Sequence, residues 1–203
     1  MKIIEEQPAA IILAAGGSKR FGQPKQLLDW FGKTFIEVAI DTALKSKLSP
    51  VIVVTGAHAD QVEDQISSYP VIIARNSDWS KGQSSSLIKG VDELVKIEDK
   101  PFIFLLCDQP QVPVVLVKGL ARKARLSKAK IVITEVGGRS QPPIYFHQAC
   151  IEEIKKLEGD QGGKIILGKY KTAHFHWNDD RIGIDCDTPE DYKKMIDSFK
   201  KCV

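Results

Sequence analysis

Short apolar runs alternate with amphipathic stretches along most of the chain. The runs are rich in Ile, Val, Leu and Phe, and Gly, Pro or charged residues bound them, a pattern that predicts buried strands. They occupy residues 9–14, 51–55, 71–74, 102–106, 131–134 and 144–146, with further candidates at 173–176 and 182–184. Between the runs, helical spacing of apolar positions predicts helices over residues 35–44, 84–95, 114–126, 148–157 and 189–202.

Strands with few polar positions that alternate with helices favour an α/β fold. We expect a mostly parallel sheet covered by helices on both faces. The 203 residues suit a single domain over residues 1–203, without a linker. In sheets of this kind, ligands bind at the carboxyl ends of the strands. The residues that follow each strand are therefore the candidates for chemistry.

The first strand opens into a glycine-rich, cationic loop, Gly16-Gly17-Ser18-Lys19-Arg20-Phe21-Gly22-Gln23-Pro24-Lys25. Free backbone N–H groups and positive charge at a strand end suit a polyphosphate. The dinucleotide-binding pattern fails at Lys19, where a glycine is required, and the P-loop pattern fails at Gln23 and Pro24. Arg20 and Lys25 remain as separate cationic groups, which suits a nucleoside triphosphate cut at its α-phosphorus.

Carboxylates follow two later strand-like runs. Asp108 comes after the fourth predicted strand, and Asp185 and Asp187 follow the last strand candidate, where an extended backbone would point both to one side. A carboxylate that leaves a buried strand needs a cation or hydrogen-bond donors, and Asp108 with Asp185 or Asp187 could hold a hard divalent cation. The alternatives are local, because Asp108 could form a turn, and Asp187 or Thr188 could cap the next helix.

Two glycine-containing segments are further candidates. Residues 82–86, Gly-Gln-Ser-Ser-Ser, precede a predicted helix, so their hydroxyls either cap it or bind a base or ribose. Residues 159–164, Gly-Asp-Gln-Gly-Gly-Lys, form either a plain loop or one that closes on a ligand. His174 and His176 share a strand face, but the sequence offers no third ligand, so chance spacing is favoured over a metal site.

Composition narrows the class of function. The net charge of +3 arises from interspersed acids and bases, which favours small anionic substrates over nucleic acid. No apolar run approaches the roughly 20 residues of a membrane span, and acidic residues precede the first run, unlike in a signal peptide. The cysteines show neither zinc nor disulfide spacing, and we expect a cytoplasmic protein. They are Cys107, Cys150, Cys186 and Cys202.

Together the motifs resemble those of the molybdenum cofactor nucleotidyltransferases, a MobA-like family, and within it the cytidylyltransferase branch. The resemblance implies a Rossmann-like nucleotidyltransferase fold whose N-terminal half binds the nucleotide and whose C-terminal half binds the pterin acceptor. Its motifs follow the family's order along almost the whole chain. They lie at residues 13–22, 25–28, 82–87, 107–110, 159–162 and 185–191.

The resemblance also implies roles for individual residues. Arg20, Lys25 and Asp108 would be catalytic, and Asp108 would bind Mg²⁺ with Asp185 or Asp187. The implied nucleotide-binding residues are Leu13, Ala14, Ala15, Gly16, Gly17, Ser18, Arg20, Lys25, Gly82, Ser84, Ser85 and Asp108. The implied acceptor-binding residues are Gln109, Gln141 and Asp160.

The implied reaction is Mg²⁺-dependent transfer of a nucleotide from CTP or another NTP to the terminal phosphate of a molybdopterin-type cofactor, with release of pyrophosphate. That phosphate needs no strong general base, because the second pKa of a phosphomonoester is about 6. Ala14-Ala15 and Phe21-Gly22 favour CTP, whereas Gln141-Pro142 resembles the guanylyltransferase branch. We therefore place CTP first and GTP second. A molybdoenzyme or its chaperone would receive the product.

Three alternatives stay open from the sequence. The acceptor could be another phosphorylated compound, since this scaffold serves several reactions. A non-catalytic accessory protein that carries the nucleotide or cofactor would keep the glycine-rich loop but would not need carboxylates at two strand ends. A metal-dependent glycosyltransferase would use Asp185-Cys186-Asp187 as its metal motif, but would explain Arg20 and Lys25 less well.

Overall fold

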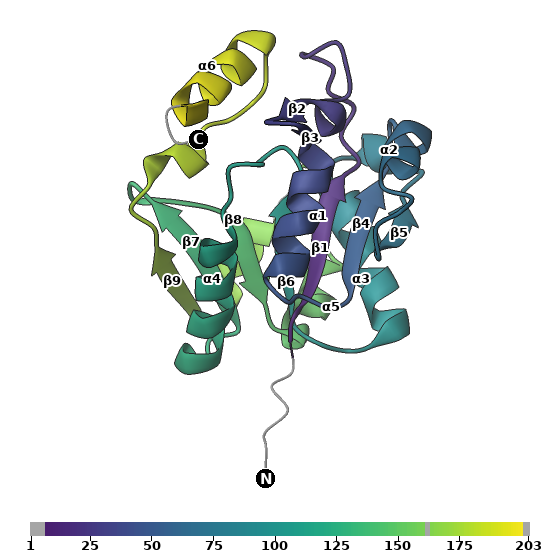
Figure 1. Ribbon diagram of the computed structural model, residues 1–203. Helices are drawn as coiled ribbons and strands as arrows, with labels where there is room; N and C mark the ends of the chain where they lie inside the picture. Colours follow the sequence, from purple (N-terminus) through teal and green to yellow (C-terminus); the bar gives the residue numbers. More distant parts are fainter. Residues whose placement is uncertain (1–6, 161–162, 201–203) are drawn as a thin grey trace.

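A mixed β-sheet forms the centre of the protein, seen in a computed structural model that describes residues 7–160 and 163–200 (Figure 1). Within these residues, seven strands pair in the order β5-β4-β1-β6-β8-β7-β9. β1 runs parallel to β4 and β6, whereas β8 runs antiparallel to β6 and β7, so the predicted mostly parallel sheet is confirmed. The strands are β1 (Ala9–Ala14), β4 (Val51–Thr55), β5 (Ile72–Arg75), β6 (Phe102–Leu106), β7 (Ile131–Val136), β8 (Arg139–Phe146) and β9 (Thr172–His176).

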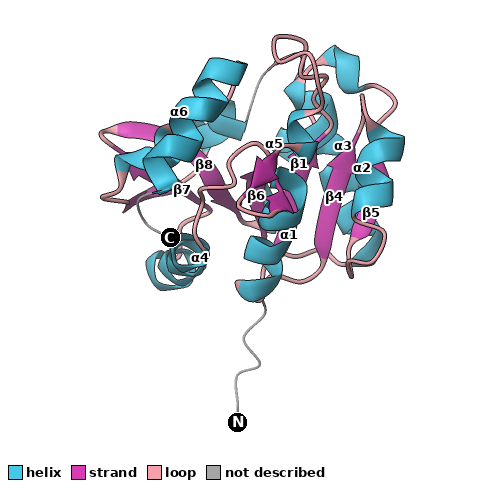
Figure 2. Ribbon diagram, turned by 45° about the horizontal axis from the view of Figure 1, so that its top comes forward, coloured by secondary structure: helices cyan, strands magenta, loops and turns pink. Residues whose placement is uncertain are grey.

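Helices cover both faces of the sheet (Figure 2). Side chains of β1 alternate between the faces: Ile12 belongs to the buried cluster that includes residues of α1 and α4, and Ile11 to the cluster that includes residues of α3 and α5. Burial of each isoleucine contributes about 1.5–3 kcal/mol, so this alternation holds both layers. No helix in the described ranges combines the length and apolarity needed to cross a membrane. The helices are α1 (Phe35–Lys45), α2 (Ala59–Gln65), α3 (Gln83–Ile97), α4 (Val114–Ser127), α5 (Ile151–Ile154) and α6 (Pro189–Phe199).

Several elements are too short or too polar for the apolar pattern to reveal. A small hairpin of β2 (Asp29–Trp30) and β3 (Lys33–Thr34) precedes α1, and α2 has seven residues. β8 begins at Arg139, before the predicted start, because its first half is polar. Gly137 and Gly138, with φ of +54° and +76°, form the tight turn that joins it to β7.

Two predictions from the pattern are wrong. The strand candidate at 182–184 is instead the end of a 3₁₀ helix, η5 (Asp180–Gly183), followed by its C-cap Ile184. The Asp179 carboxylate fixes the start of η5 by accepting from the Arg181 N–H at 3.1 Å. The apolar alternation there reflects burial of Ile182 against the core, not strand pairing. The helix expected at 148–157 is shorter, because it consists of a 3₁₀ turn and the four residues of α5.

The C-terminal helix α6 returns to the N-terminal part of the chain. The Tyr192 hydroxyl donates to the Asp29 carbonyl at 2.8 Å, and the Phe199 ring centroid lies 5.2 Å from that of Trp30. Tyr192 also makes an edge contact with Phe21 of the loop after β1, with centroids 6.2 Å apart. These contacts hold α6 at the carboxyl end of β1, opposite the end where β1 begins (Figure 1).

Candidate active site

The loop after β1 presents unused backbone donors. The N–H groups of residues 16–20 donate to no acceptor within the described part of the chain. Ser18, at φ +49°, reverses the backbone, and its carbonyl accepts from Phe21 at 2.9 Å and Gly22 at 3.2 Å. Its hydroxyl accepts from the Lys25 N–H at 3.0 Å. Consecutive free N–H groups on a folded loop can bind an anion without rearrangement of the backbone.

An ion cluster lies beside this loop. The Lys25 Nζ is 3.0 Å from Asp108 Oδ2 and 3.2 Å from Asp187 Oδ1, while an Arg20 guanidinium nitrogen is 2.9 Å from Asp187 Oδ2. The Lys25 side chain is 15% exposed, in contrast to 72% for Arg20. Burial opposes the charge of Lys25, but Asp108 and Asp187 outweigh it and raise its pKa above the usual value. Lys25 is therefore a fixed positive charge between two carboxylates.

Asp108 reaches the cluster because β6 ends beside β1. The Cys107 N–H donates to the Leu13 carbonyl at 3.1 Å, which extends the parallel pairing one residue past β6. The Gln109 N–H then closes a turn onto the Leu106 carbonyl at 3.4 Å. As expected for a parallel sheet, the turn places a carboxylate at the carboxyl end of two neighbouring strands.

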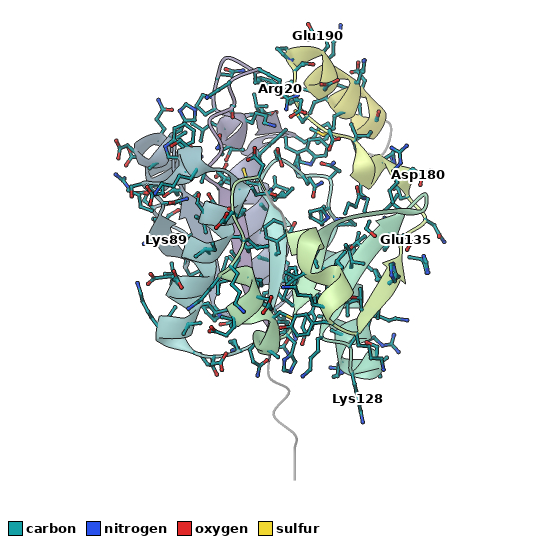
Figure 3. All side chains as sticks on the ribbon, turned by 180° about the vertical axis from the view of Figure 1, so that it is seen from behind. Arg20, Lys89, Lys128, Glu135, Asp180 and Glu190 are labelled. Atoms are coloured by element: carbon teal, nitrogen blue, oxygen red, sulfur yellow. The ribbon has the colours of Figure 1, made fainter. Side chains whose placement is uncertain are left out.

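Asp187 joins the ion cluster from the position directly before the N-cap of α6. Thr188 is the N-cap: its hydroxyl accepts from the Asp191 N–H at 3.2 Å, and the Asp191 carboxylate accepts from the Thr188 N–H at 3.0 Å. The hydrogen bonds from Thr188 lower the pKa of Asp191 despite some desolvation. The cap is thus complete without Asp187, whose carboxylate binds Lys25 and Arg20 instead. Figure 3 shows Arg20 and Glu190 of α6 at the same end of the molecule, with Lys128 at the other.

The loop and the ion cluster border a cavity of about 500 Å³. Most residues predicted for the site line it: Leu13, Ala14, Ala15, Gly16, Gly17, Ser18, Arg20, Lys25, Gly82, Asp108, Asp160 and Asp187. Five described residues predicted for the site do not line it: Ser84, Ser85, Gln109, Gln141 and Asp185. The cavity lining therefore contains most, but not all, of the residues that the sequence predicts for the site.

The expectation that both aspartates before α6 point the same way is wrong. Asp187 lines the cavity, whereas Asp185 is exposed outside it, because the backbone between them is irregular and not a strand. Gln109 is buried beside Asp108, and Gln141 lies against Gly183. Of the three predicted acceptor residues, only Asp160 borders the cavity.

The serines at the start of α3 bind protein backbone. The Ser84 hydroxyl and N–H both donate to the Gly159 carbonyl, at 2.7 and 3.1 Å, and the Ser85 hydroxyl donates to the Gly82 carbonyl at 2.8 Å. Contact of Ser84 or Ser85 with a base or ribose therefore has no support in these hydrogen bonds. These hydrogen bonds anchor the loop that carries Asp160 to the start of α3. The next two residues of that loop, Gln161 and Gly162, lie outside the described residues.

Replacing Gly82 with alanine should disrupt this anchor. Gly82 has φ +108° and ψ 175°, a region open essentially to glycine alone, and an added Cβ would lie 2.3 Å from Gly159 backbone atoms. We expect the free energy of unfolding to fall by about 3 kcal/mol or more. The matched control is Gly138→Ala, at φ +76° with no atom within 4 Å of the added Cβ, which should cost about 1–2 kcal/mol. Urea denaturation measures both, and equal losses would contradict the anchor.

Several cavity residues are absent from the individual site assignments made from the sequence, although Ser86 belongs to the candidate segment 82–86: Lys19, Gln26, Trp79, Ser80, Gln83 and Ser86. Trp79 lies against the glycine-rich loop, where a Cβ on Gly17 would be 3.0 Å from its ring. Ser86, the third serine of the run, accepts from the Asn76 amide at 3.0 Å. Nothing in the local pattern distinguishes Ser86 from its two neighbours, because the helical turn decides which of them faces the cavity.

The thiols near the cavity are protonated at neutral pH. Burial raises the pKa of Cys107 well above its usual value and that of Cys186 to about 11. Neither is therefore poised as a nucleophile. Cys202 lies outside the described residues. His174 and His176 lie away from the cavity, with their Nδ1 atoms 2.7 and 3.3 Å from the Glu135 carboxylate.

The donor set fits a hard cation that also binds a polyphosphate. Within the described residues there is no group of three or more His, Cys, Asp or Glu side chains arranged to hold a metal ion. Asp108 and Asp187, bridged by Lys25, are two carboxylates at the cavity wall. Mg²⁺ commonly binds one or two protein carboxylates and completes its shell with substrate phosphates and water. The pair therefore fits such an ion in the presence of nucleotide.

Several known proteins are similar to this chain over nearly their full length. Purine catabolism protein PucB of Bacillus subtilis is 32% identical over 192 residues, which cover 90% of this chain and 92% of PucB. A probable molybdenum cofactor guanylyltransferase of Bacillus cytotoxicus is 27% identical, with 95% and 98% covered. The crystal structure of Rv0371c of Mycobacterium tuberculosis in complex with manganese superposes with a TM-score of 0.77 at 21% identity, covering 95% and 100% of the two chains.

A family model matches most of the sheet and the cavity. The match spans residues 10–174, from β1 with its loop to β9, and its description is MobA-like NTP transferase domain. It includes the cationic loop, Asp108 and the start of α3, which border the cavity. The expected Rossmann-like nucleotidyltransferase fold is confirmed by the structural likeness, which includes a nucleotidyl transferase from Methanothermobacter with a TM-score of 0.84 at 22% identity. The chain belongs to the MobA-like NTP transferase family and is a nucleotidyltransferase of that family.

Proposed function

We propose that this protein transfers CMP from CTP to the terminal phosphate of a molybdopterin-type acceptor, with Mg²⁺ as the metal and pyrophosphate as the second product. The observation that carries the proposal is Lys25, held between Asp108 and Asp187 beside the free N–H groups of residues 16–20. A triphosphate needs donors and cations, and a metal needs carboxylates. Both sets border one cavity.

The chain's own residues supply position and charge. The N–H groups of residues 16–20 would bind the triphosphate, while Lys25 and Arg20 would compensate the charge that develops as the bond from the α-phosphorus to the bridging oxygen breaks. Asp108 and Asp187 would hold the divalent cation, which when bound neutralises phosphate charge. The manganese complex of the M. tuberculosis neighbour supports a divalent cation on this fold.

The acceptor phosphate attacks the α-phosphorus through one of its own oxygens. At neutral pH it is largely dianionic, so no protein base has to remove a proton. The protonated state of Cys107 and Cys186 agrees with a direct transfer that forms no covalent intermediate on a thiol. Asp160, which borders the cavity from the C-terminal half of the chain, is the acceptor-side residue that we propose.

GTP is the second candidate nucleotide. Ala14-Ala15 and Phe21-Gly22 favour CTP, but the B. cytotoxicus relative bears the name of a guanylyltransferase, and Gln141-Pro142 leans the same way. Ala14 and Ala15 line the cavity, whereas Gln141 does not. We give the residues that border the cavity the greater weight, and CTP stays first.

Pyrophosphate release tests the proposal directly. The purified protein is incubated with Mg²⁺, molybdopterin cofactor and CTP, GTP, ATP or UTP in turn, and pyrophosphate and the dinucleotide product are measured. We expect CTP to give a kcat/KM at least about tenfold above GTP, a difference of 1.4 kcal/mol. Preference for GTP would overturn the base assignment. Binding of nucleotide without turnover by any acceptor would point to the accessory-protein alternative.

A further inference from the structure

Two buried glutamines make the same unusual contact, one with the loop after β1 and the other with the segment before α6. Gln26 is 3% exposed, and its amide nitrogen donates to the carbonyls of Ala14 and Gly16, both at 2.8 Å. Gln111 is 6% exposed, and its amide nitrogen donates to the carbonyls of Ile182 and Ile184, at 3.1 and 2.9 Å. Each side chain thus fastens two alternate carbonyls of one segment.

Gln26 fastens the segment that offers free N–H groups. Ala14 is the last residue of β1, and Gly16 begins the loop, so the amide spans the point where regular pairing ends. The preceding residue, Lys25, donates its backbone N–H to the Ser18 hydroxyl at 3.0 Å. The loop is therefore fixed at three points by two consecutive residues, one of which carries the ammonium of the ion cluster.

Gln111 links the segments that carry the two carboxylates. It lies three residues after Asp108, and the carbonyl of Ile184, which it binds, lies three residues before Asp187. No strand pairing holds the 182–187 segment, because it forms η5 and irregular backbone. The hydrogen bonds of Gln111 thus set where this segment runs relative to the turn after β6.

Packing alone does not explain an amide at either position. The Oε1 atoms of Gln26 and Gln111 are buried and have no hydrogen-bond partner within the described ranges. An unpartnered buried acceptor costs about 1–3 kcal/mol, which a methionine of similar shape would avoid. Gln26 and Gln111 both retain this cost, and in both cases the donated hydrogen bonds fix backbone near the ion cluster.

We propose that Gln26 and Gln111 are positioning residues of the transfer site. Gln26 holds the loop that receives the triphosphate, and Gln111 sets the separation of Asp108 and Asp187. The inference rests on the proposed function, and it predicts that the two side chains affect different ligands. Loss of Gln26 weakens nucleotide binding, whereas loss of Gln111 weakens metal binding to the nucleotide complex.

The test compares Gln26→Met and Gln111→Met by direct binding, without acceptor. Calorimetry gives the Kd for CTP, and Mn²⁺ electron paramagnetic resonance gives the Kd for metal in the presence of CTP. Two lost hydrogen bonds correspond to roughly a tenfold change. We expect Gln26→Met to raise the CTP Kd about tenfold, and Gln111→Met to raise the Mn²⁺ Kd about tenfold with the CTP Kd within about twofold of wild type.

Gln148→Met is the matched control, because Gln148 also has a buried, unpartnered Oε1 but lies in the 3₁₀ turn before α5, away from both the loop after β1 and the segment before α6. It should leave both Kd values unchanged. Thermal denaturation checks each variant, and Gln26→Leu and Gln111→Leu replace any that fails to fold. Equal shifts of both constants in both variants, or no shift in either, would overturn the positioning roles. If the wild-type protein binds no nucleotide, the proposed function itself fails, which is a separate outcome.

Discussion

Replacement of Lys25 by methionine should lower kcat about 10²–10³-fold, the effect of removing one group that stabilises charge in a transition state. The Kd for the nucleotide should rise less than about tenfold, because the N–H groups of residues 16–20 still bind phosphate. Lys25 is held between two carboxylates with its side chain 15% exposed, so its position is fixed before substrate arrives. A preorganised charge is of most use where charge develops during the reaction.

The same variant should change metal binding in the opposite direction. In the structure the Lys25 ammonium pairs with both Asp108 and Asp187, so a cation that binds both carboxylates competes with it for their charge. Without the ammonium, Asp108 loses its cationic partner and Asp187 keeps only Arg20, so the affinity of the pair for Mn²⁺ in the absence of nucleotide should rise. A triphosphate would offer Lys25 a new partner, which makes binding of metal and nucleotide mutually favourable in the wild-type protein.

Lys19→Met is the control for Lys25→Met. Lys19 also borders the cavity, yet it makes no ion pair with any described residue. Its loss should raise KM a few-fold with little change in kcat, as expected for an exposed charge that acts on binding alone. Single-turnover kinetics and calorimetry separate the two constants. If Lys25→Met weakened binding as much as turnover, Lys25 would be a simple anchor for the triphosphate.

The parallel core of the sheet could be predicted because its strands are buried on both faces. The runs of β1, β4 and β6 are almost wholly apolar, and such runs have few other stable placements. Candidate ligand-binding residues after β1 and β6 could then be chosen, because ligands bind at the carboxyl ends of parallel strands. β8 was only half recognised, because Ser140 and Gln141 pair with β7 through backbone atoms that the apolar pattern does not report.

Most residues of the candidate site could be chosen from the sequence by their type, but the direction in which their side chains point could not be predicted. Charged residues in a glycine-rich loop and after buried strands have few purposes, so Arg20, Lys25 and Asp108 could be selected from the sequence. Which of Asp185 and Asp187 faces the cavity depends on irregular backbone held by Gln111, a contact 73 residues apart in sequence. The serines at the start of α3 were assigned to ligand because the sequence does not reveal that Gly159 lies beside them.

Replacement of Asp108 by asparagine should reduce transfer by at least about 10³-fold, since charge stabilisation by a bound metal is worth several kcal/mol and each 1.36 kcal/mol is tenfold. Asparagine keeps the size of the side chain but loses the charge. Lys25 retains Asp187 as its partner, and Asp108 is 37% exposed, so the free energy of unfolding should change by no more than about 1 kcal/mol. Loss of turnover in a folded protein then reports on the site alone.

Mn²⁺ binding distinguishes the carboxylates that hold the cation. Asp108→Asn and Asp187→Asn should each weaken Mn²⁺ binding in the presence of nucleotide by about tenfold or more, because each removes one of two charged ligands. Asp185→Asn should leave it unchanged, since Asp185 is exposed and outside the cavity lining. Electron paramagnetic resonance of Mn²⁺ measures all three variants. If Asp185→Asn weakened Mn²⁺ binding as much as Asp187→Asn, the segment before α6 would have to rearrange when metal binds. Full activity of Asp108→Asn would remove Asp108 from the metal site.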